Sequence, residues 1–578
     1  MKNIKNLLFL LSSKQIYKAK IIIILLFFGS CLEVIGYAFV VPIVAIIASE
    51  DGYIKIINII SISNFKDFKR SELIFYFLVF YFIFSIFKTL YLHLLNSYRN
   101  KFIYNFQENL SQKLFKNYLN KDYVFFLKNN SSKLISDCTE SVNLATYSLE
   151  SFFVLFTEVF ILLFFSTILL IYNPAITLTV MIILLILILG FFYYYSKKLK
   201  IWGEKRKIVY ENIIQDLQEG FSGIRDIILG NKFLFFLNSF KDLNKKNSYF
   251  MYKNSVGTQN PKYFLEFAGA FFLVTIVSYL IFKNSSNSVL ISTLSLFALS
   301  FFRLMPCFYR ILSSYQTIKF HSSSIKSLQE PLLESINHFN EDIRKNLSNI
   351  NSSDIFKKYI EFNNVNFSYT NQKIILKNIN LRINKKETVA IVGETGSGKS
   401  TFLDLLLGLL NPDTGKISID DNILSDVRKL WHAKIAYVSQ NFYFIDDSLL
   451  SNIAFGDPDN INITKITDLL KGFNLAYLAS RIEDGKDVNI GERGSSLSMG
   501  EKQRISIIKA LYKDPPILIF DEITSSLDQK NEKLVINEIE KIKKDKTIIF
   551  VSHKKSSIEF CDTVYEIKDQ TLKKVINN

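Results

Sequence analysis

Six long apolar runs in the first 320 residues constrain the fold more than any other feature of the chain. Each is close to the roughly 20 residues that an α-helix needs to cross a bilayer. Hydrophobic residues make up 49% of the chain, but they gather in these runs, whereas the rest has the mixed composition of a soluble α/β domain. We therefore predict an all-α membrane domain with six spans, followed by a soluble domain. The runs lie at about 21–48, 73–95, 151–172, 175–195, 263–282 and 289–312.

The polar segments between the runs predict how the chain is oriented. Residues 96–150 and 196–262 are long and polar, and the stretch 197–207 is rich in Lys and Arg. Because basic residues favour the cytoplasmic side, both segments and the N-terminus are expected in the cytoplasm, with residues 50–72 outside. We expect short helices near 122–127 and 221–229 to dock on the soluble domain. Many of the basic residues behind the net charge of +16 lie in loops beside the apolar runs, where they set the membrane orientation. No nucleic-acid partner is therefore expected.

The composition divides the chain into three parts. We assign residues 1–321 to the membrane domain and 357–578 to the soluble domain. Residues 322–356 are rich in Ser, Asn, Glu and Lys and are predicted to form a linker. From Tyr359 onward, short apolar strands alternate with helices, which is the pattern of an α/β fold.

A glycine-rich segment of the soluble domain joins an apolar strand to a helix and carries the spacing G-x-x-x-x-G-K-S. Its glycines allow positive φ, so backbone N–H groups and the helix N-terminus can surround a phosphate. Lys399 would bind the β and γ oxygens, and Ser400 would ligate Mg²⁺. An ordinary glycine-rich turn could show this spacing by itself, but the motifs below favour a site for ATP and Mg²⁺. The loop residues assigned to it are Gly393, Glu394, Thr395, Gly396, Ser397, Gly398, Lys399, Ser400 and Thr401.

Two carboxylates follow the apolar strand that ends at Phe520. In an open α/β sheet, acids at the C-terminal end of a buried parallel strand lie beside the phosphate loop. Asp521 is then placed to hold Mg²⁺, and Glu522 is the natural general base for the water that attacks the γ-phosphorus. Taken alone, the same pair could be a strand end beside a helix cap.

The segment Leu497 to Arg504, preceded by Ile490 to Gly494, lies between these motifs. It resembles the signature motif of exporter-type ABC transporters and the loop before it, and further family motifs follow the same order along the chain. The resemblance implies a cytosolic P-loop nucleotide-binding domain of the ABC type attached to an exporter-type membrane domain. The residues that it adds are Tyr369 for adenine stacking, Gln440 for sensing Mg²⁺ and contacting the membrane domain, Ser525 to Asp528 for the dimer-facing loop, and His553 for the γ-phosphate.

The signature segment departs from the family pattern at two positions. Met499 and Glu501 stand where the usual Leu-Ser-Gly-Gly-Gln has Gly and Gln, whereas Ser498 and Gly500 are retained. In the family this loop closes on ATP held by the opposite subunit, so Ser498 and Gly500 are assigned to the ATP site. Met499 adds a Cβ and Glu501 a negative charge beside the phosphate. We expect the two changes to slow hydrolysis without abolishing it.

The chain carries one phosphate loop and one signature segment, and the family's ATP site takes these from two different domains. We therefore expect a dimer, most simply of two copies of this chain. Whether a different half-transporter is the true partner stays open.

Ionisable residues in the apolar runs bear on what is transported, because a charge inside the bilayer is costly. Arg303 and Arg310 are two helical turns apart and share a face of the last run. With Lys88 and Lys262 they could line a cationic cavity for an anionic head group. Alternatively, they reach the cytosolic interface or pair with Glu33 and Glu266.

The apolar runs also resemble the PglK-type flippases for lipid-linked oligosaccharides, through Leu32-Glu33, Tyr263 to Glu266 and above all Ser292 to Ile311. That resemblance implies that the substrate is a polyprenyl-pyrophosphate glycan, which the protein would flip from the inner to the outer leaflet of the membrane lipids. The composition, rich in Lys, Asn, Ile and Phe, indicates a bacterium, so the homodimer is expected in the bacterial inner membrane. Export of a peptide or another lipid is the alternative. A non-transporting ATP-gated switch is disfavoured by Glu522 and His553, and a soluble ABC ATPase by the six apolar runs.

Overall fold

The computed structural model describes residues 2–48, 70–172, 174–282, 287–333, 355–369, 374–457, 460–524, 527–552, 554 and 558–575. It divides into two compact units. The first comprises Met1–Lys121 and Phe125–Phe339, and the second comprises Asp122–Val124 and Asn340–Asn578. The predicted linker contains the short helix α12 (Ser322–Ser327), and its residues 334–354 lie outside the described ranges.

The first unit is helical, as predicted, and each of the six apolar runs lies within a long helix. Among the described residues, Ser13–Tyr37, Ser71–Leu119 and Ser131–Ile171 are long and apolar enough to cross a membrane. The other three runs are helical parts of α8, α10 and α11. The long helices are α2 (Ser13–Ala48), α4 (Arg70–Leu119), α7 (Val142–Tyr172), α8 (Pro174–Ser222), α10 (Phe233–Phe282) and α11 (Asn287–Phe320).

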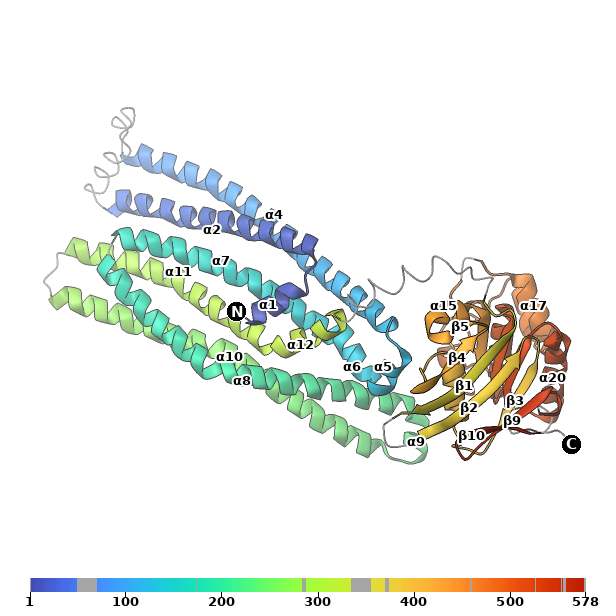
Figure 1. Cartoon of the computed structure of the whole chain (residues 1–578). Helices are drawn as coiled ribbons and strands as arrows, with labels where there is room; N and C mark the ends of the chain where they lie inside the picture. The colour runs from blue at the N-terminus through green and yellow to red at the C-terminus, as the bar shows by residue number, and fades with distance from the viewer. Residues whose placement is uncertain are drawn as a thin grey trace. The chain divides into compact units, whose positions relative to one another are not determined.

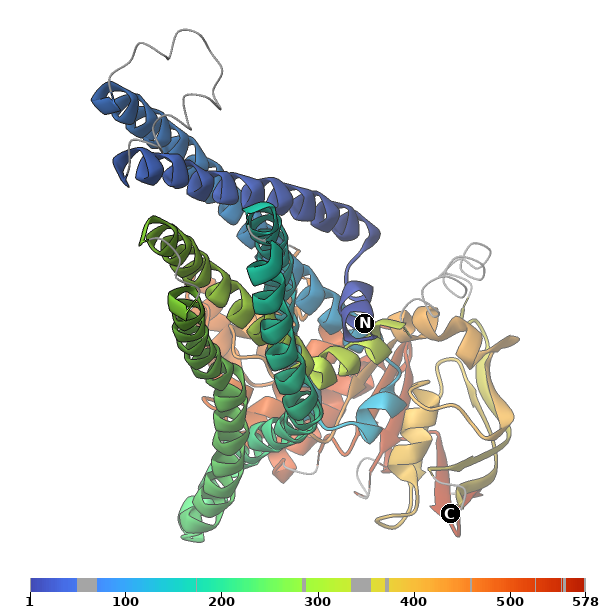
Figure 2. The same ribbon diagram turned by 90° about the vertical axis from the view of Figure 1, so that its left-hand side faces the viewer.

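Several of these helices extend far beyond a bilayer. Helix α4 has 50 residues, which at 1.5 Å per residue gives about 75 Å, whereas the hydrocarbon core is about 30 Å thick. Much of the polar segments 96–150 and 196–262 is therefore helix that continues from the apolar runs. Helix α8 packs along α10 and α7 along α11, as Figures 1 and 2 show. Phe82 on α4 is 66% exposed, as expected for a helix that faces lipid.

Short helices occur where the sequence predicts them, at α5 (Tyr123–Lys128) and α9 (Ile224–Leu229). Further short elements of this unit are α1 (Lys2–Phe9), α6 (Ser131–Ser136) and the π-helix η2 (Asp137–Ser141). Docking of α5 and α9 on the soluble domain stays a prediction.

The second unit contains two β-sheets, in the order β2-β1-β4-β5 and β10-β9-β3-β8-β7-β6. The first sheet is antiparallel. In the second, only the β9–β10 pair is antiparallel. The strands are β1 (Tyr359–Ser368), β2 (Ile374–Asn384), β3 (Thr388–Val392), β4 (Thr414–Ile419), β5 (Asn422–Ile423), β6 (Ile435–Val438), β7 (Ile517–Asp521), β8 (Thr547–Val551), β9 (Thr563–Lys568) and β10 (Thr571–Val575).

The parallel sheet is buried on both faces because side chains of a strand alternate between them. Ile517 and Ile519 of β7 pack in one apolar core, and Leu518 and Phe520 pack in the other. Helices accompany the two sheets, and Figure 1 labels α15, α17 and α20 among them. They are α14 (Lys399–Leu406), α15 (Leu424–Lys434), α16 (Leu449–Ile453), α17 (Ile463–Gly472), α18 (Ala476–Glu483), α19 (Met499–Tyr512) and α20 (Gln529–Lys543), with the 3₁₀ turn η4 (Glu492–Gly494).

Strand order explains how distant motifs meet. Strand β8 pairs with β3 on one side and β7 on the other, and all three are parallel. The loop after β3 and the carboxylates after β7 therefore emerge at the same edge of the sheet, where ligands bind in folds of this type.

Candidate nucleotide site

The loop between β3 and α14 has the conformation that a phosphate loop requires. Gly393 has φ 151°, and a Cβ placed there would lie 2.5 Å from the carbonyl oxygen of Ile567. Gly398 caps α14 with φ 106°. The Ser397 hydroxyl is buried with no hydrogen-bond partner among the described residues. A glycine cradle, an unpaired hydroxyl and a helix N-terminus fit the phosphates of a nucleotide.

Lys399 lies over this loop. Its ammonium donates hydrogen bonds to the carbonyl oxygens of Gly393, at 2.6 Å, and Glu394, at 2.9 Å. Burial lowers its pKa, whereas Glu522 and Asp521 act in the opposite direction. The cation is therefore held where the loop backbone and the two carboxylates converge.

The carboxylates occupy two different environments. Asp521 ends β7 and accepts a hydrogen bond from the Tyr437 hydroxyl at 3.0 Å. Burial raises the pKa of Asp521, and the Tyr437 hydrogen bond opposes that rise. Glu522 has φ 52°, an uncommon backbone conformation for a residue with a side chain, and its N–H donates to the carbonyl of Val551 at 2.8 Å. Such an outlier supports a functional role for Glu522.

Two further predicted residues contact this group. The Gln440 side-chain amide donates to Glu522 Oε2 at 2.8 Å, so the fold brings together two residues 82 positions apart. The Tyr369 hydroxyl lies 3.3 Å from Thr401 Oγ1, which places the predicted adenine-stacking ring beside the helix of the phosphate loop. Ser400 is exposed in the first turn of that helix. His553 and Ser525 lie outside the described residues.

The signature segment begins α19. Ser498 is its N-cap, and Glu501 completes a capping box. Met499 is 60% exposed, and Gly500 lies in the first turn. Glu501 lies in this first turn as well. In addition, its carboxylate accepts hydrogen bonds from Ser498 and from the Tyr477 hydroxyl of α18.

Sequence reasoning missed Tyr437 and Tyr477. Tyr437 lies in β6, three positions before Gln440. Its place near the carboxylates could therefore have been inferred from the segment that contains Gln440. Tyr477 carries no such signal, because α18 reaches Glu501 only through the tertiary fold.

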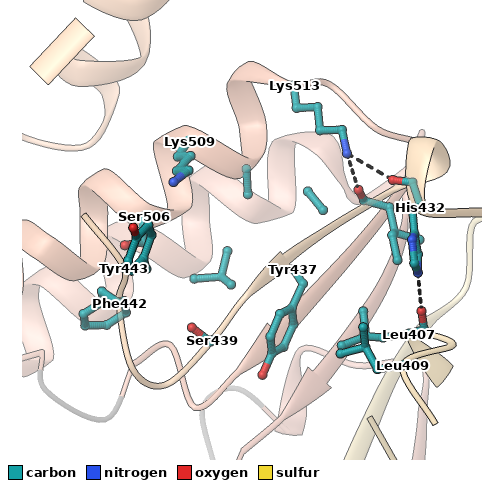
Figure 3. Close-up of a pocket in the computed structure, with 14 residues that line it drawn as sticks. Leu407, Leu409, His432, Tyr437, Ser439, Phe442, Tyr443, Ser506, Lys509 and Lys513 are labelled. Atoms are coloured by element: carbon teal, nitrogen blue, oxygen red, sulfur yellow. Dashed lines mark hydrogen bonds between the residues drawn. The ribbon is translucent and has the colours of Figure 1, made fainter. Parts of the chain in front are cut away.

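A separate cavity of about 420 Å³ lies beside the strand that leads to Gln440. Figure 3 shows Lys513 at one end, where its ammonium donates to the carbonyl oxygens of His432, at 3.1 Å, and Ile435, at 3.0 Å. The phosphate loop does not line this cavity, and Tyr437 connects it with Asp521. Aromatic and aliphatic side chains make up much of its wall, including Leu407, Leu409, Phe442 and Tyr443.

The cations predicted to line a substrate cavity have varied environments. Arg310 Nη1 lies 2.6 Å from Glu158 Oε1, and the Glu158 side chain is 4% exposed. Lys262 forms an exposed ion pair with Glu266 at 3.8 Å. The ammonium of Lys88 lies against Gly36 of α2. The sequence analysis offered ion pairs with Glu33 and Glu266 as the alternative to a cationic cavity. Lys262 does pair with Glu266, whereas Arg310 pairs with Glu158. The side chain of Arg303 lies outside the described ones.

Known protein families match residues in both units of the chain. Residues 376–525 match the family described as ABC transporter, and residues 19–305 match the ABC transporter transmembrane region. The chain belongs to the ABC transporter family. This ABC transporter also shares its fold with a bacterial Atm1-family ABC exporter, at a TM-score of 0.76 and 18% identity over 97% of this chain and 94% of that one.

Relatives of this ABC transporter include flippases. It is 37% identical over 215 residues to an ATP-dependent lipid A-core flippase of Pectobacterium atrosepticum, covering 37% of each chain. It is 38% identical over 208 residues to ABC transporter B family member 14 of Arabidopsis thaliana, covering 36% of this chain and 17% of that one. The alignments therefore span well under half of these relatives.

Proposed function

We propose that this ABC transporter hydrolyses ATP and uses the energy to flip a lipid-linked oligosaccharide across the cytoplasmic membrane. The observation that carries the ATPase proposal is the convergence of Lys399, Asp521, Glu522 and Gln440 at one edge of the sheet. Glu522 would act as general base on the attacking water, and Gln440 would orient its carboxylate. His553, which resembles the family's γ-phosphate contact, is proposed to complete the catalytic group.

Mg²⁺ is the expected cofactor, because hydroxyl, amide and carboxylate oxygens are the hard ligands that it prefers. Ser400, Gln440 and Asp521 would hold it. The ion supplies neutralisation of phosphate charge when bound. Tyr369 would stack on the adenine, and the loop from Gly393 to Thr401 would hold the phosphates.

We propose a homodimer in which Ser498 and Gly500 of one copy contact ATP held by the other. The exposed N-terminal end of α19 at Ser498 supports this arrangement. ATP present at about 100 times its Kd would favour the closed pair by about 2.7 kcal/mol per site. Two sites then supply about 5.5 kcal/mol, enough to move an equilibrium from about 1:99 to 99:1. Binding would close the pair, and hydrolysis would reset it.

The proposed cargo is a polyprenyl-pyrophosphate glycan in the bacterial inner membrane. Two observations support an anionic lipid: the named flippase among the relatives and the cations along α4, α10 and α11. The side chain of Arg310 is about half exposed in spite of its ion pair, which leaves part of its guanidinium available. The nucleotide-binding unit is proposed to lie in the cytoplasm. A peptide or a plain lipid stays the alternative cargo.

The test measures ATPase activity of purified protein in lipid, with and without a polyprenyl-pyrophosphate oligosaccharide. We expect the substrate to stimulate wild type, R303A/R310A to lose the stimulation but keep basal hydrolysis, and E522Q to lose hydrolysis. K113A/K241A is the matched control, because it removes two exposed positive charges outside the predicted spans. Basal hydrolysis that ignores this lipid in wild type would overturn the cargo and leave the ATPase proposal standing.

A further inference from the structure

We propose that Glu501 and Tyr477 latch the signature loop: they hold the Ser498 hydroxyl, and ATP bound to a second copy must displace the Glu501 carboxylate to reach it. This inference rests on the two-copy ATP site proposed above. It assigns Glu501 and Tyr477 as positioning residues that set the ATP concentration at which the site closes.

The contacts of Glu501 occupy both oxygens of its carboxylate. Oε2 accepts from the backbone N–H of Ser498 at 2.8 Å and from the Ser498 hydroxyl at 2.8 Å. Oε1 accepts from the Tyr477 hydroxyl. The backbone N–H of Glu501 in turn donates to Ser498 Oγ at 3.3 Å. Ser498 therefore uses its single hydroxyl proton on Glu501 and must break that bond before it can donate to a phosphate.

The Glu501 carboxylate and an ATP phosphate would compete for the N-terminus of α19, because both are negatively charged. The N-terminus of α19 attracts anions, and a phosphate from a second copy would approach the end that the carboxylate already occupies. Burial would raise the pKa of Glu501, but hydrogen bonds from Tyr477 and Ser498 together hold it below its ordinary value. The competing group is therefore an anion under physiological conditions, and it uses the donors that the phosphate needs.

Tyr477 keeps the carboxylate in place. It comes from α18, a different helix, so rotation of Glu501 away from Ser498 also breaks a contact between two helices. Burial raises the pKa of Tyr477 to about 12, and the hydrogen bond to Glu501 adds to that rise. The phenol therefore stays protonated and continues to donate.

The experiment compares KM for ATP and kcat in wild type, E501Q and Y477F, as full-length protein in lipid. Gln also completes a capping box, so E501Q keeps α19 capped, but its neutral hydrogen bonds are about half as strong as those of a carboxylate. We expect KM to fall about five- to tenfold in E501Q and about two- to threefold in Y477F, with kcat within about twofold of wild type.

The controls separate the latch from general effects. E540Q removes an exposed carboxylate from α20, and Y512F removes a hydroxyl from the other end of α19. Both should keep the KM of wild type. If Glu501 is purely a structural cap, KM for ATP stays unchanged in both E501Q and Y477F, and that result would overturn the latch.

A further arm tests the two-copy site on which the latch depends. In the E522Q background, ATP should bring the two nucleotide-binding units together, which a crosslink between copies reports, and S498A should raise the ATP concentration required. If ATP does not induce the pairing, the two-copy site fails and the latch with it. If pairing occurs but E501Q leaves KM unchanged, the latch alone is wrong.

Discussion

The side-chain amide of Gln440 donates a hydrogen bond to the Glu522 carboxylate over 2.8 Å. Gln440 follows strand β6 and Glu522 follows strand β7, and these strands are parallel neighbours. Any movement of the Gln440 loop therefore acts directly on the proposed general base. With Glu522 as the proposed base, this contact would link ATP hydrolysis to the backbone conformation of the loop after β6.

Removal of the base is the first prediction. E522Q should lower kcat for ATP hydrolysis by about 100-fold or more, because general base catalysis contributes that much in typical enzymes. ATP binding should persist. Phosphate release measures the change in kcat, and equilibrium binding of ATP to the same preparation shows whether binding persists. Hydrolysis within tenfold of wild type would assign the base to another residue.

Tyr437 should position Asp521 for Mg²⁺. Y437F removes the hydrogen bond to Asp521, so the Mg²⁺ concentration for half-maximal ATPase should rise about threefold or more, as expected for the loss of one hydrogen bond to a carboxylate. Y443F is the matched control, since it removes an exposed hydroxyl from the same cavity shown in Figure 3. An unchanged Mg²⁺ requirement in Y437F would show that Asp521 keeps its position without the phenol.

Asp404 should make stability depend on pH. Burial, with a contribution from Asp521, raises its pKa from 3.8 to about 6. The folded state therefore binds the proton more tightly than the unfolded state does. The stabilisation is complete below about pH 4 and is lost as pH rises through 6. At pH 8 the ionised Asp404 should cost about 1 kcal/mol after solvent screening.

D404N should consequently unfold at a higher temperature than wild type at pH 8, and this advantage should shrink toward pH 4. Thermal unfolding in a chelator, without nucleotide, measures it because bound Mg²⁺ would alter the local charge. D468N, an exposed control on α17, should show no such trend. An equal effect of both variants at every pH would exclude Asp404 as the cause.

The Arg310–Glu158 ion pair should stabilise the helical unit. R310M leaves the buried Glu158 without this partner, so Tm in detergent should fall by several degrees. Breaking buried pairs costs about 3–5 kcal/mol, and the partial exposure of Arg310 should reduce that figure. E158Q/R310M should recover most of the loss. If the double variant is no more stable than R310M, the two side chains are not coupled.

Residue types and spacing in the sequence were sufficient to predict the helical and α/β parts, and they indicated the residues of the candidate nucleotide site. Gly393 and Gly398 have the positive φ that the loop pattern requires, and Asp521 and Glu522 lie at the strand end as predicted. These features are local, because a strand, a tight turn and a helix N-terminus are specified by consecutive residues. The ABC transporter match over residues 376–525 includes these motifs.

Tertiary structure alone decided which side chains meet across elements. Tyr477 reaches Glu501, Tyr437 reaches Asp521 and Arg310 reaches Glu158 through contacts between separate helices or strands. No spacing in the sequence encodes the Tyr477–Glu501 and Arg310–Glu158 pairs, because they depend on helix rotation and packing between residues 24 and 152 positions apart. The motifs indicate where a phosphate would bind, and packing determines which side chains contact Asp521 and Glu501.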